Sequence, residues 1–210
     1  MEAIITLLAR ELGQKEEYVE NVVRLLDEGN TIPFIARYRK ELHGAMDDTT
    51  LRSLEERLGY LRSLDQRRQE VKRSIENQGK LTEELSVAID GAATLAEVED
   101  LYRPYKQKRR TRATVAREKG LEPLAEAIFG QSAKLPPLEE LAKDYVDEEK
   151  SVTTVEEALQ GASDIIAEQI SDDAEIRKTL RTAMQQQAEA ASKAAQEDAD
   201  SVYRTYYDFH

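Results

Sequence analysis

The longest regular pattern in this chain is a row of apolar residues that recur at three- and four-residue spacing. The row comprises Leu51, Leu54, Leu58, Leu61, Leu64, Val71 and Ile75. This spacing places them on one face of an α-helix, and no proline interrupts residues 48–78. We predict a helix of about 30 residues and ~45 Å there. Its apolar face must pack along several other elements, and its charged outer face is expected to be solvated and linked by i,i+4 pairs.

The other segments also follow helical periodicity, and no alternating run of β-branched residues reaches the length of a strand. The predicted fold class is therefore all-α. Residues 1–45 contain three short helices, of which the first two stop at Gly13 and Gly29. Thr31 and Pro33 are expected to open the third. Three short helices with tight turns resemble a helix-turn-helix unit.

Residues 1–134 are predicted to form one helical body. Behind the long helix, Thr94 with Glu97 three positions later makes a capping box for a helix that ends at Pro104. A loop follows, with one short helical stretch predicted from residue 114 onward. Pro123 is expected to open the last helix of the body.

Residues 135–200 are predicted to form an acidic helical extension. Thr153 with Glu156 makes a second capping box, and Ser171 is expected to cap a last helix. That helix runs into a stretch rich in alanine and glutamine, which has little to bury. Residues 201–210 are interpreted as a linker to a further domain.

Charge is unevenly distributed along the chain. Residues 1–134 carry 24 acidic and 23 basic side chains, net -1, whereas residues 135–210 carry 18 and 7, net -11. One short span of the near-neutral body is strongly basic, with Glu118 as its only acid. Its cations are Arg103, Lys106, Lys108, Arg109, Arg110, Arg112, Arg117 and Lys119.

Clustered guanidinium and ammonium groups suit contacts with phosphate, and Tyr105 lies between the first two cations, where an aromatic ring can stack on a base. Residues 103–119 are therefore the first candidate for weak, sequence-independent contacts with RNA or single-stranded DNA. Two other interpretations stay open. The cations pair with acids of the protein itself, or they meet an acidic protein partner.

The third short helix is a second, weaker candidate for nucleic-acid contacts, because Arg37, Arg39 and Lys40 surround Tyr38 there. In a helix-turn-helix protein such a helix can enter the major groove. The alternative, which the sequence favours, is a short amphipathic helix with Arg37 and Lys40 solvated, since trihelical packing is common without DNA binding.

The sequence carries no catalytic motif. It has no cysteine, and its two histidines, His43 and His210, are far apart and expected at the surface, so no catalytic residue, metal site or cofactor is assigned. Acid pairs such as Asp172–Asp173 lie at predicted helix starts, where they complement the helix dipole. The apolar runs are too short for a bilayer. We expect a cytoplasmic, monomeric protein that is not an enzyme and does not bind a membrane.

Three stretches carry a family resemblance: TIPFIARYRKEL, LRSLEERLGYLRSLDQRRQEVKRSIENQGKLTEEL and DLYRPYKQKRRTRATVAREKGLEPLA. From about residue 7 to about residue 180, the chain resembles the N-terminal helical region of the Tex family of bacterial RNA-binding transcription accessory proteins. The resemblance implies a fragment that lacks the RNase-H-like, helix-hairpin-helix and C-terminal OB-type RNA-binding domains of complete members. It implies no chemical site in this region.

On this basis we expect a non-enzymatic helical module that adds nucleic-acid contacts and scaffolds the downstream domains. The alternative is a protein-interaction module that docks on RNA polymerase, the ribosome or other Tex domains.

Overall fold

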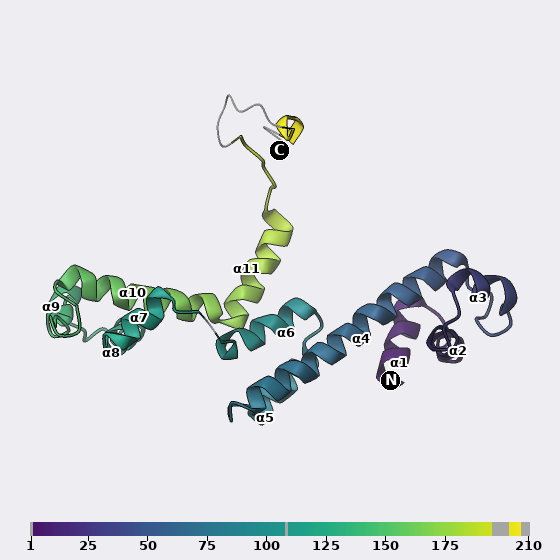
Figure 1. The fold of residues 1–210 in the computed structure, drawn as a ribbon, viewed down its shortest axis with the longest axis horizontal. Helices are drawn as coiled ribbons and strands as arrows, with labels where there is room; N and C mark the ends of the chain where they lie inside the picture. The colour runs from purple at the N-terminus through teal and green to yellow at the C-terminus, as the bar shows by residue number, and fades with distance from the viewer. Residues whose placement is uncertain (1, 108, 195–201, 207–210) are drawn as a thin grey trace. The chain divides into compact units, whose positions relative to one another are not determined.

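A computed structural model describes residues 2–107, 109–194 and 202–206 of the chain. Within these ranges the protein consists of eleven α-helices and two 3-10 turns, without a β-strand (Figure 1). The predicted all-α class is confirmed. The chain divides into two units, Met1–Val98 and Glu99–His210, and each has a buried hydrophobic core of its own.

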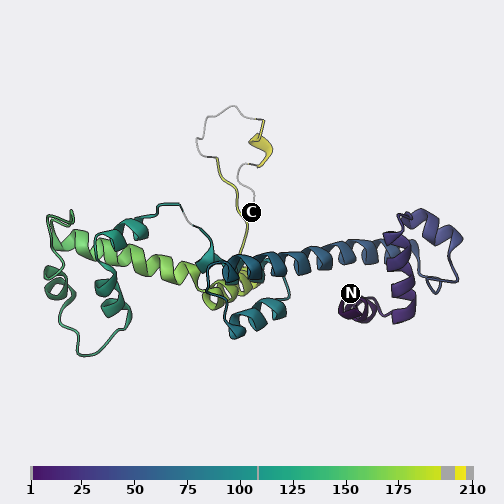
Figure 2. The ribbon, with the colours of Figure 1, turned by 60° about the horizontal axis from the view of Figure 1, so that its bottom comes forward.

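In the first unit, helices α1 (Glu2–Leu12), α2 (Glu16–Asp27) and α3 (Ile32–Tyr38) pack on the long helix α4 (Asp48–Glu76). They gather at its N-terminal end, whereas α5 (Glu83–Gly91) packs at its C-terminal end (Figure 2). The side chains without exposed surface include Leu8, Val19, Val22, Ile35, Leu51 and Leu54. The predicted long helix and its cover by several elements are therefore confirmed.

The ends of the helices in this unit follow the predicted signals with one exception. The Asp47 carboxylate begins α4 by accepting a hydrogen bond from the Thr50 N–H at 2.7 Å. The helix runs through Gly59 and ends before Gly79, which has a φ of +68°. Thr31 occupies the N-cap position of α3, but its hydroxyl makes no capping hydrogen bond.

Charged residues on the outer face of α4 do more than pair within the helix. The pair of Arg52 with Asp48 has the predicted i,i+4 spacing, and that of Arg67 with Glu70 has i,i+3 spacing. Arg57, however, donates two hydrogen bonds to Glu11 on α1, at 2.7 and 2.8 Å. Arg62 likewise donates two to Asp27 on α2, at 2.7 and 2.8 Å. These bonds tie α4 to its neighbours and hold the pKa values of Glu11 and Asp27 below their usual range.

The prediction that His43 lies at the surface is wrong, and His210 lies outside the described residues. The His43 side chain is only 1% exposed, in the turn between α3 and α4. Neither of its ring nitrogens has a hydrogen-bond partner among the described residues. A lone histidine in a connection has no periodicity that would reveal its burial, so its burial was not predictable from the sequence.

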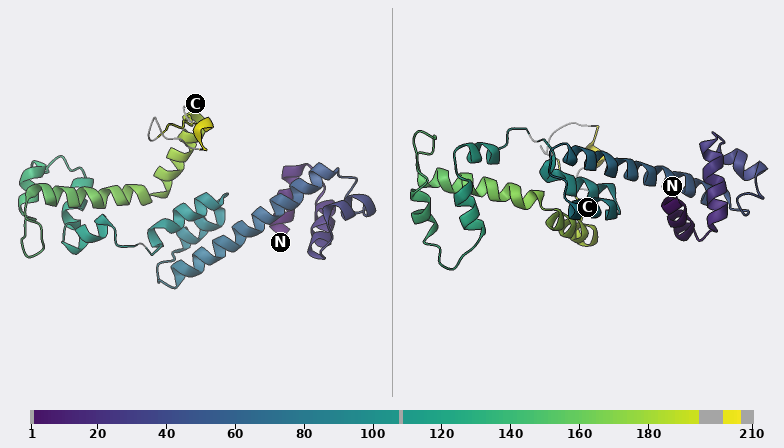
Figure 3. Two further views of the ribbon diagram at one scale, coloured as in Figure 1. Left: turned by 45° about the horizontal axis from the view of Figure 1, so that its top comes forward. Right: turned by 90° about the horizontal axis from the view of Figure 1, so that it is seen from below.

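The second unit is organised around α10 (Val155–Asp172), on which α7 (Arg112–Glu118), α8 (Glu122–Phe129) and α9 (Leu138–Lys143) pack (Figure 3). Its buried side chains include Leu121, Leu124, Ala158, Ala162 and Ile165. Helix α10 lies in the predicted acidic extension, yet its apolar face forms one side of this core. The predicted domain boundaries at residues 134 and 200 stay predictions.

The start of α10 is shifted by one residue from the predicted capping box. The Thr154 hydroxyl, not that of Thr153, accepts a hydrogen bond from the Glu157 N–H at 3.2 Å. Glu157 rather than Glu156 completes the box, because its carboxylate accepts a hydrogen bond from the Thr153 N–H at 2.7 Å. Adjacent pairs of threonine and of glutamate made the two registers equivalent in sequence.

Helix α11 (Ala174–Gln187) has no buried residue. It is capped by Asp173 rather than by the predicted Ser171. Its tie to α6 (Leu95–Tyr102) is Asp100, whose carboxylate accepts hydrogen bonds from two arginines of α11. Residues 188–194 are not helical, and the predicted linker contains a 3-10 turn, η2 (Arg204–Tyr206), in its described part.

Candidate nucleic-acid interface

Residues 103–119 are the basic segment. In its described part a 3-10 turn, η1 (Arg103–Tyr105), is followed by non-helical chain at 106–107 and 109–111 and then by α7. Helix α7 starts two residues earlier than predicted, because the Thr111 hydroxyl accepts a hydrogen bond from the Thr114 N–H at 3.1 Å. Arg112 therefore lies on the helix rather than on the loop, and Arg117 lies on the helix as predicted. Tyr105 is half-buried, and Lys108 lies outside the described residues.

Helix α10 faces the basic segment with three carboxylates at four-residue spacing, which lie about 6 Å apart along the helix axis. We call Asp164, Glu168 and Asp172 the acidic row. Each of them meets one arginine of the basic segment. The pairs are Arg112 Nε with Asp164 Oδ1 at 3.6 Å, Arg117 Nη1 with Glu168 Oε2 at 2.7 Å, and Arg103 Nε with Asp172 Oδ1 at 2.9 Å.

Part of the basic segment therefore holds the second unit together. Glu168 also accepts a hydrogen bond from the Thr111 hydroxyl at 3.0 Å. Its hydrogen bond with Arg117 raises the pKa of that guanidinium above the usual value, although burial acts in the opposite direction. Lys119 donates to the backbone carbonyl of Ser151 at 2.7 Å. The pairing of cations with the protein's own acids thus applies to some of the predicted site residues.

Four cations keep their charged groups toward solvent, and one of them, Arg112, is also paired with the acidic row. Lys106 and Arg109 are exposed, with no ion-pair partner among the described residues. Arg110 pairs with Glu118 at 2.7 Å and Arg112 with Asp164, but the two arginine side chains are 70% and 86% exposed. Exposed pairs contribute only about 0–1 kcal/mol, so a phosphate can replace the carboxylate. We call Lys106, Arg109, Arg110 and Arg112 the exposed cations.

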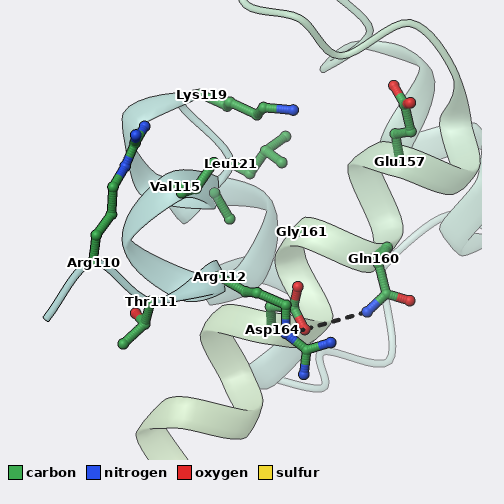
Figure 4. Close-up of a pocket in the computed structure, with 11 residues that line it drawn as sticks. Arg110, Thr111, Arg112, Val115, Lys119, Leu121, Glu157, Gln160, Gly161 and Asp164 are labelled. Carbon is green, nitrogen blue, oxygen red and sulfur yellow. Dashed lines mark hydrogen bonds and ion pairs between the residues drawn. The ribbon is translucent and has the colours of Figure 1, made fainter.

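A pocket of about 450 Å³ opens between α7 and α10 beside these cations (Figure 4). Its apolar lining, which we call the floor, includes Val115, Leu121 and Gly161. Gln160 and Asp164 form a polar edge, where the Gln160 amide donates a hydrogen bond to Asp164 at 3.3 Å.

The second candidate site lies in the first unit, at the end of α3. The Arg39 guanidinium lies 5.3 Å from the centre of the Phe34 ring and donates a hydrogen bond to the carbonyl of Tyr38 at 3.1 Å. Arg37 and Lys40 are exposed, as expected for a short amphipathic helix. These residues belong to a different unit from the basic segment, so they form a separate candidate.

The described residues offer no other site of recognisable chemistry. Among them, no three histidine, aspartate or glutamate side chains lie close enough together to hold a metal ion. None of the helices in the described ranges has the length and apolar character needed to cross a membrane.

Sequence reasoning missed the acidic row, although its four-residue spacing is visible in the printed sequence. The spacing predicts that the three carboxylates share a helix face. Which cations they meet depends on the packing of α7 on α10, for which local sequence carries no signal.

Comparison with known proteins identifies two family models. One, the Tex-like protein N-terminal domain, matches residues 2–76, and the other, Tex central region-like, matches residues 133–210. The basic segment lies between these matches, but alignments with whole relatives include it. The chain is 46% identical over 209 residues to the protein tex of Bordetella pertussis, an alignment that covers 99% of this chain and 26% of the relative.

Two further relatives extend this finding. The transcriptional accessory protein Tex of Neisseria gonorrhoeae is 41% identical over 207 residues, which are 98% of this chain and 27% of the relative. The human S1 RNA-binding domain-containing protein 1 is 32% identical over 166 residues, which are 79% of this chain and 16% of the relative. The chain thus spans about a quarter of the length of the bacterial relatives.

Proposed function

The chain belongs to the Tex family, and we propose that it is a non-enzymatic helical module of a transcription accessory protein. In this proposal it makes weak, sequence-independent contacts with phosphates of RNA or single-stranded DNA and scaffolds further domains. The name of the Neisseria relative supports a role in transcription, and that of the human relative supports RNA as the partner. We further propose that the protein acts in the cytoplasm as a monomer.

One observation carries the nucleic-acid proposal: the exposed cations lie within seven consecutive positions, 106–112, and meet only two carboxylates in the described chain. Phosphate binding depends on local rather than overall charge. The many acidic residues elsewhere in the second unit therefore do not prevent it. Arg103, Arg117 and Lys119, which the sequence placed in the same site, are assigned to the fold instead. If the four exposed cations meet four phosphates of a single strand, log K falls with log salt with a slope of roughly -3.

The test is fluorescence anisotropy with a labelled single-stranded RNA of ~12 nucleotides at ~50 mM salt. Changing Lys106→Gln and Arg109→Gln together is expected to weaken binding about tenfold. The matched control, Lys143→Gln with Lys178→Gln, removes two exposed lysines of the same unit and should leave affinity unchanged. Equal losses in both variants would show a nonspecific effect of net charge and refute the site.

The second candidate site is tested in the same assay. Arg37→Gln with Lys40→Gln removes two solvent-exposed charges, one on α3 and one just after its end. We expect little change, because the sequence and the exposure of both side chains fit a solvated helix face. A loss as large as that of the 106/109 variant would move the interface to the first unit.

A protein-interaction module is the second candidate function, and α11 favours it. Ile176, Leu180 and Met184 recur every four residues along this helix and are exposed, with Met184 at 64%. Such a row can dock on RNA polymerase, the ribosome or other Tex domains. Cross-linking of tagged chain in a bacterial extract, after nuclease treatment, tests it. A captured protein that Leu180→Asp releases would favour docking, whereas nuclease-sensitive capture would favour RNA.

A further inference from the structure

We infer that the pocket between α7 and α10 receives one unstacked base of the bound strand, an inference that rests on the proposed function. Its volume of about 450 Å³ lies within the ~300–1,000 Å³ of typical small-molecule sites. A base has two apolar faces and a polar edge. The pocket offers the complementary surfaces, an apolar floor and a polar edge.

The floor exists because residue 161 is a glycine. A Cβ at this position would lie 2.3 Å from Leu121 Cδ1 and 3.3 Å from Ala116 Cβ. Since glycine has none, α10 lies close to the start of α8, and Leu121 and Val115 point from the α7 side toward α10 (Figure 4). Aliphatic side chains of this kind can contact the face of any base, which agrees with sequence-independent binding.

The polar edge can hydrogen-bond a base in both directions. The Gln160 amide is a donor and an acceptor, and the Asp164 carboxylate oxygens are acceptors. The Arg112 guanidinium, which lies over Asp164 at the pocket opening (Figure 4), is planar and can stack on a base.

Charge at the rim favours a nucleotide over an apolar side chain of a protein partner. Arg110, Arg112 and Lys119 line the pocket, and the remaining exposed cations precede them directly in the chain. Phosphates on either side of an inserted base would therefore meet positive charge. The acid on the opposite side of the pocket, Glu157, is held toward Thr153, because its Oε2 accepts hydrogen bonds from the N–H and the hydroxyl of Thr153 at 2.7 and 3.0 Å.

The deciding experiment compares two labelled RNAs of ~12 nucleotides, identical in backbone, of which one lacks the bases at its central positions. Binding to the unaltered chain is measured by anisotropy at ~50 mM salt. We expect the complete RNA to bind about fivefold or more tightly, the contribution of one well-contacted base. Equal binding of the two RNAs would overturn the inference while leaving the proposed function intact. No binding of either RNA would overturn both.

Two variants test whether the tighter binding of the complete RNA depends on the pocket. Val115→Met narrows the pocket, and Gln160→Leu removes the amide of the polar edge at an exposed position. Both should bind the complete RNA no better than the abasic one and retain unchanged affinity for the abasic one. Val87→Met, on an exposed site of α5, is the matched control and should keep the preference. If a folded Val115→Met variant and the Gln160→Leu variant both still prefer the complete RNA, the base binds elsewhere, and the assignment of this pocket is refuted.

Discussion

Among single residues, Asp100 is the only carboxylate that is buried in the described part of the chain. It is 4% exposed and accepts hydrogen bonds from Arg177, at 2.6 Å, and from Arg181. Burial by itself would raise the pKa of this carboxyl, but the hydrogen bonds from the two arginines outweigh burial, and its pKa is lowered. Asp100 is therefore the main polar link between α6 and α11.

We expect Asp100→Asn to lower the free energy of unfolding at pH 7 by about 2 kcal/mol, because it replaces charge-assisted hydrogen bonds by weaker ones. A lowered pKa contributes stability that is complete above the ordinary aspartate pKa of ~3.9 and is lost as pH falls through the folded-state value. The stability gap between the two proteins should therefore begin to narrow below about pH 4 and continue to narrow as pH falls further. Urea unfolding between pH 7 and pH 3 measures it, and a gap of the same size at pH 7 and pH 3 would contradict the role of the charge.

Among the helices, α4 contains an internal glycine that lowers its stability and can be replaced. Gly59 lies inside the helix, is exposed, and has open space where a Cβ would project. Gly59→Ala should therefore raise the free energy of unfolding by about 0.5–1 kcal/mol, since alanine loses less backbone entropy in a helix. Thermal melting followed by circular dichroism checks this.

Gly44→Ala is the informative contrast in the same unit. Gly44 has a φ of +61°, and a Cβ there would lie 2.3 Å from the Tyr18 ring. We expect this change to destabilise the unit by ~1–3 kcal/mol, because it combines backbone strain with a steric clash. Similar effects of the two substitutions would mean that the turn after α3 differs from the one described.

The acidic row of α10 is expected to compete with nucleic acid for the basic segment. Asp164→Asn with Asp172→Asn leaves Arg112 and Arg103 without carboxylate partners and keeps Glu168, which supports the fold through Arg117. RNA affinity should rise, and the salt slope should steepen by roughly 0.7 for each phosphate gained. The control, Glu156→Gln with Glu175→Gln, removes equal charge at exposed sites. An equal rise in the control would indicate overall charge rather than competition.

The elements themselves were largely predictable, because apolar periodicity and glycine stops are local signals. The row from Leu51 to Ile75 and the stop at Gly79 were sufficient to predict α4. The partners of the charges were not predictable. Arg57 and Arg103 reach acids 46 and 69 positions away, and only tertiary packing brings such residues together. For the same reason the candidate site was too broad, since the sequence could not separate structural from exposed cations.

At the scale of the whole molecule, the two units have separate cores, and the basic segment with its acidic row lies entirely within the second. The predicted acidic extension, residues 135–200, could occupy the basic segment and so block RNA. Removing the extension is not a valid test of this idea. A deletion after Gly130 would take away α10 and expose Leu121 and Leu124, which are buried in the core of this unit. Loss of binding in such a deletion would report unfolding, not the effect of negative charge.

A cut before the capping box of α6 is the better division of the molecule. The cut moves residues 93–98 of the first unit, with the buried Val98, into the second piece, but 1–92 and 93–210 each keep one complete hydrophobic cluster. We therefore expect both pieces to be helical and to unfold cooperatively. The piece 93–210 should bind single-stranded RNA like the whole chain, since it contains every exposed cation and the pocket, while 1–92 should not bind. Anisotropy on the two pieces, with circular dichroism to verify folding, measures this. Binding by a folded 1–92 would instead assign the interface to Arg37, Arg39 and Lys40.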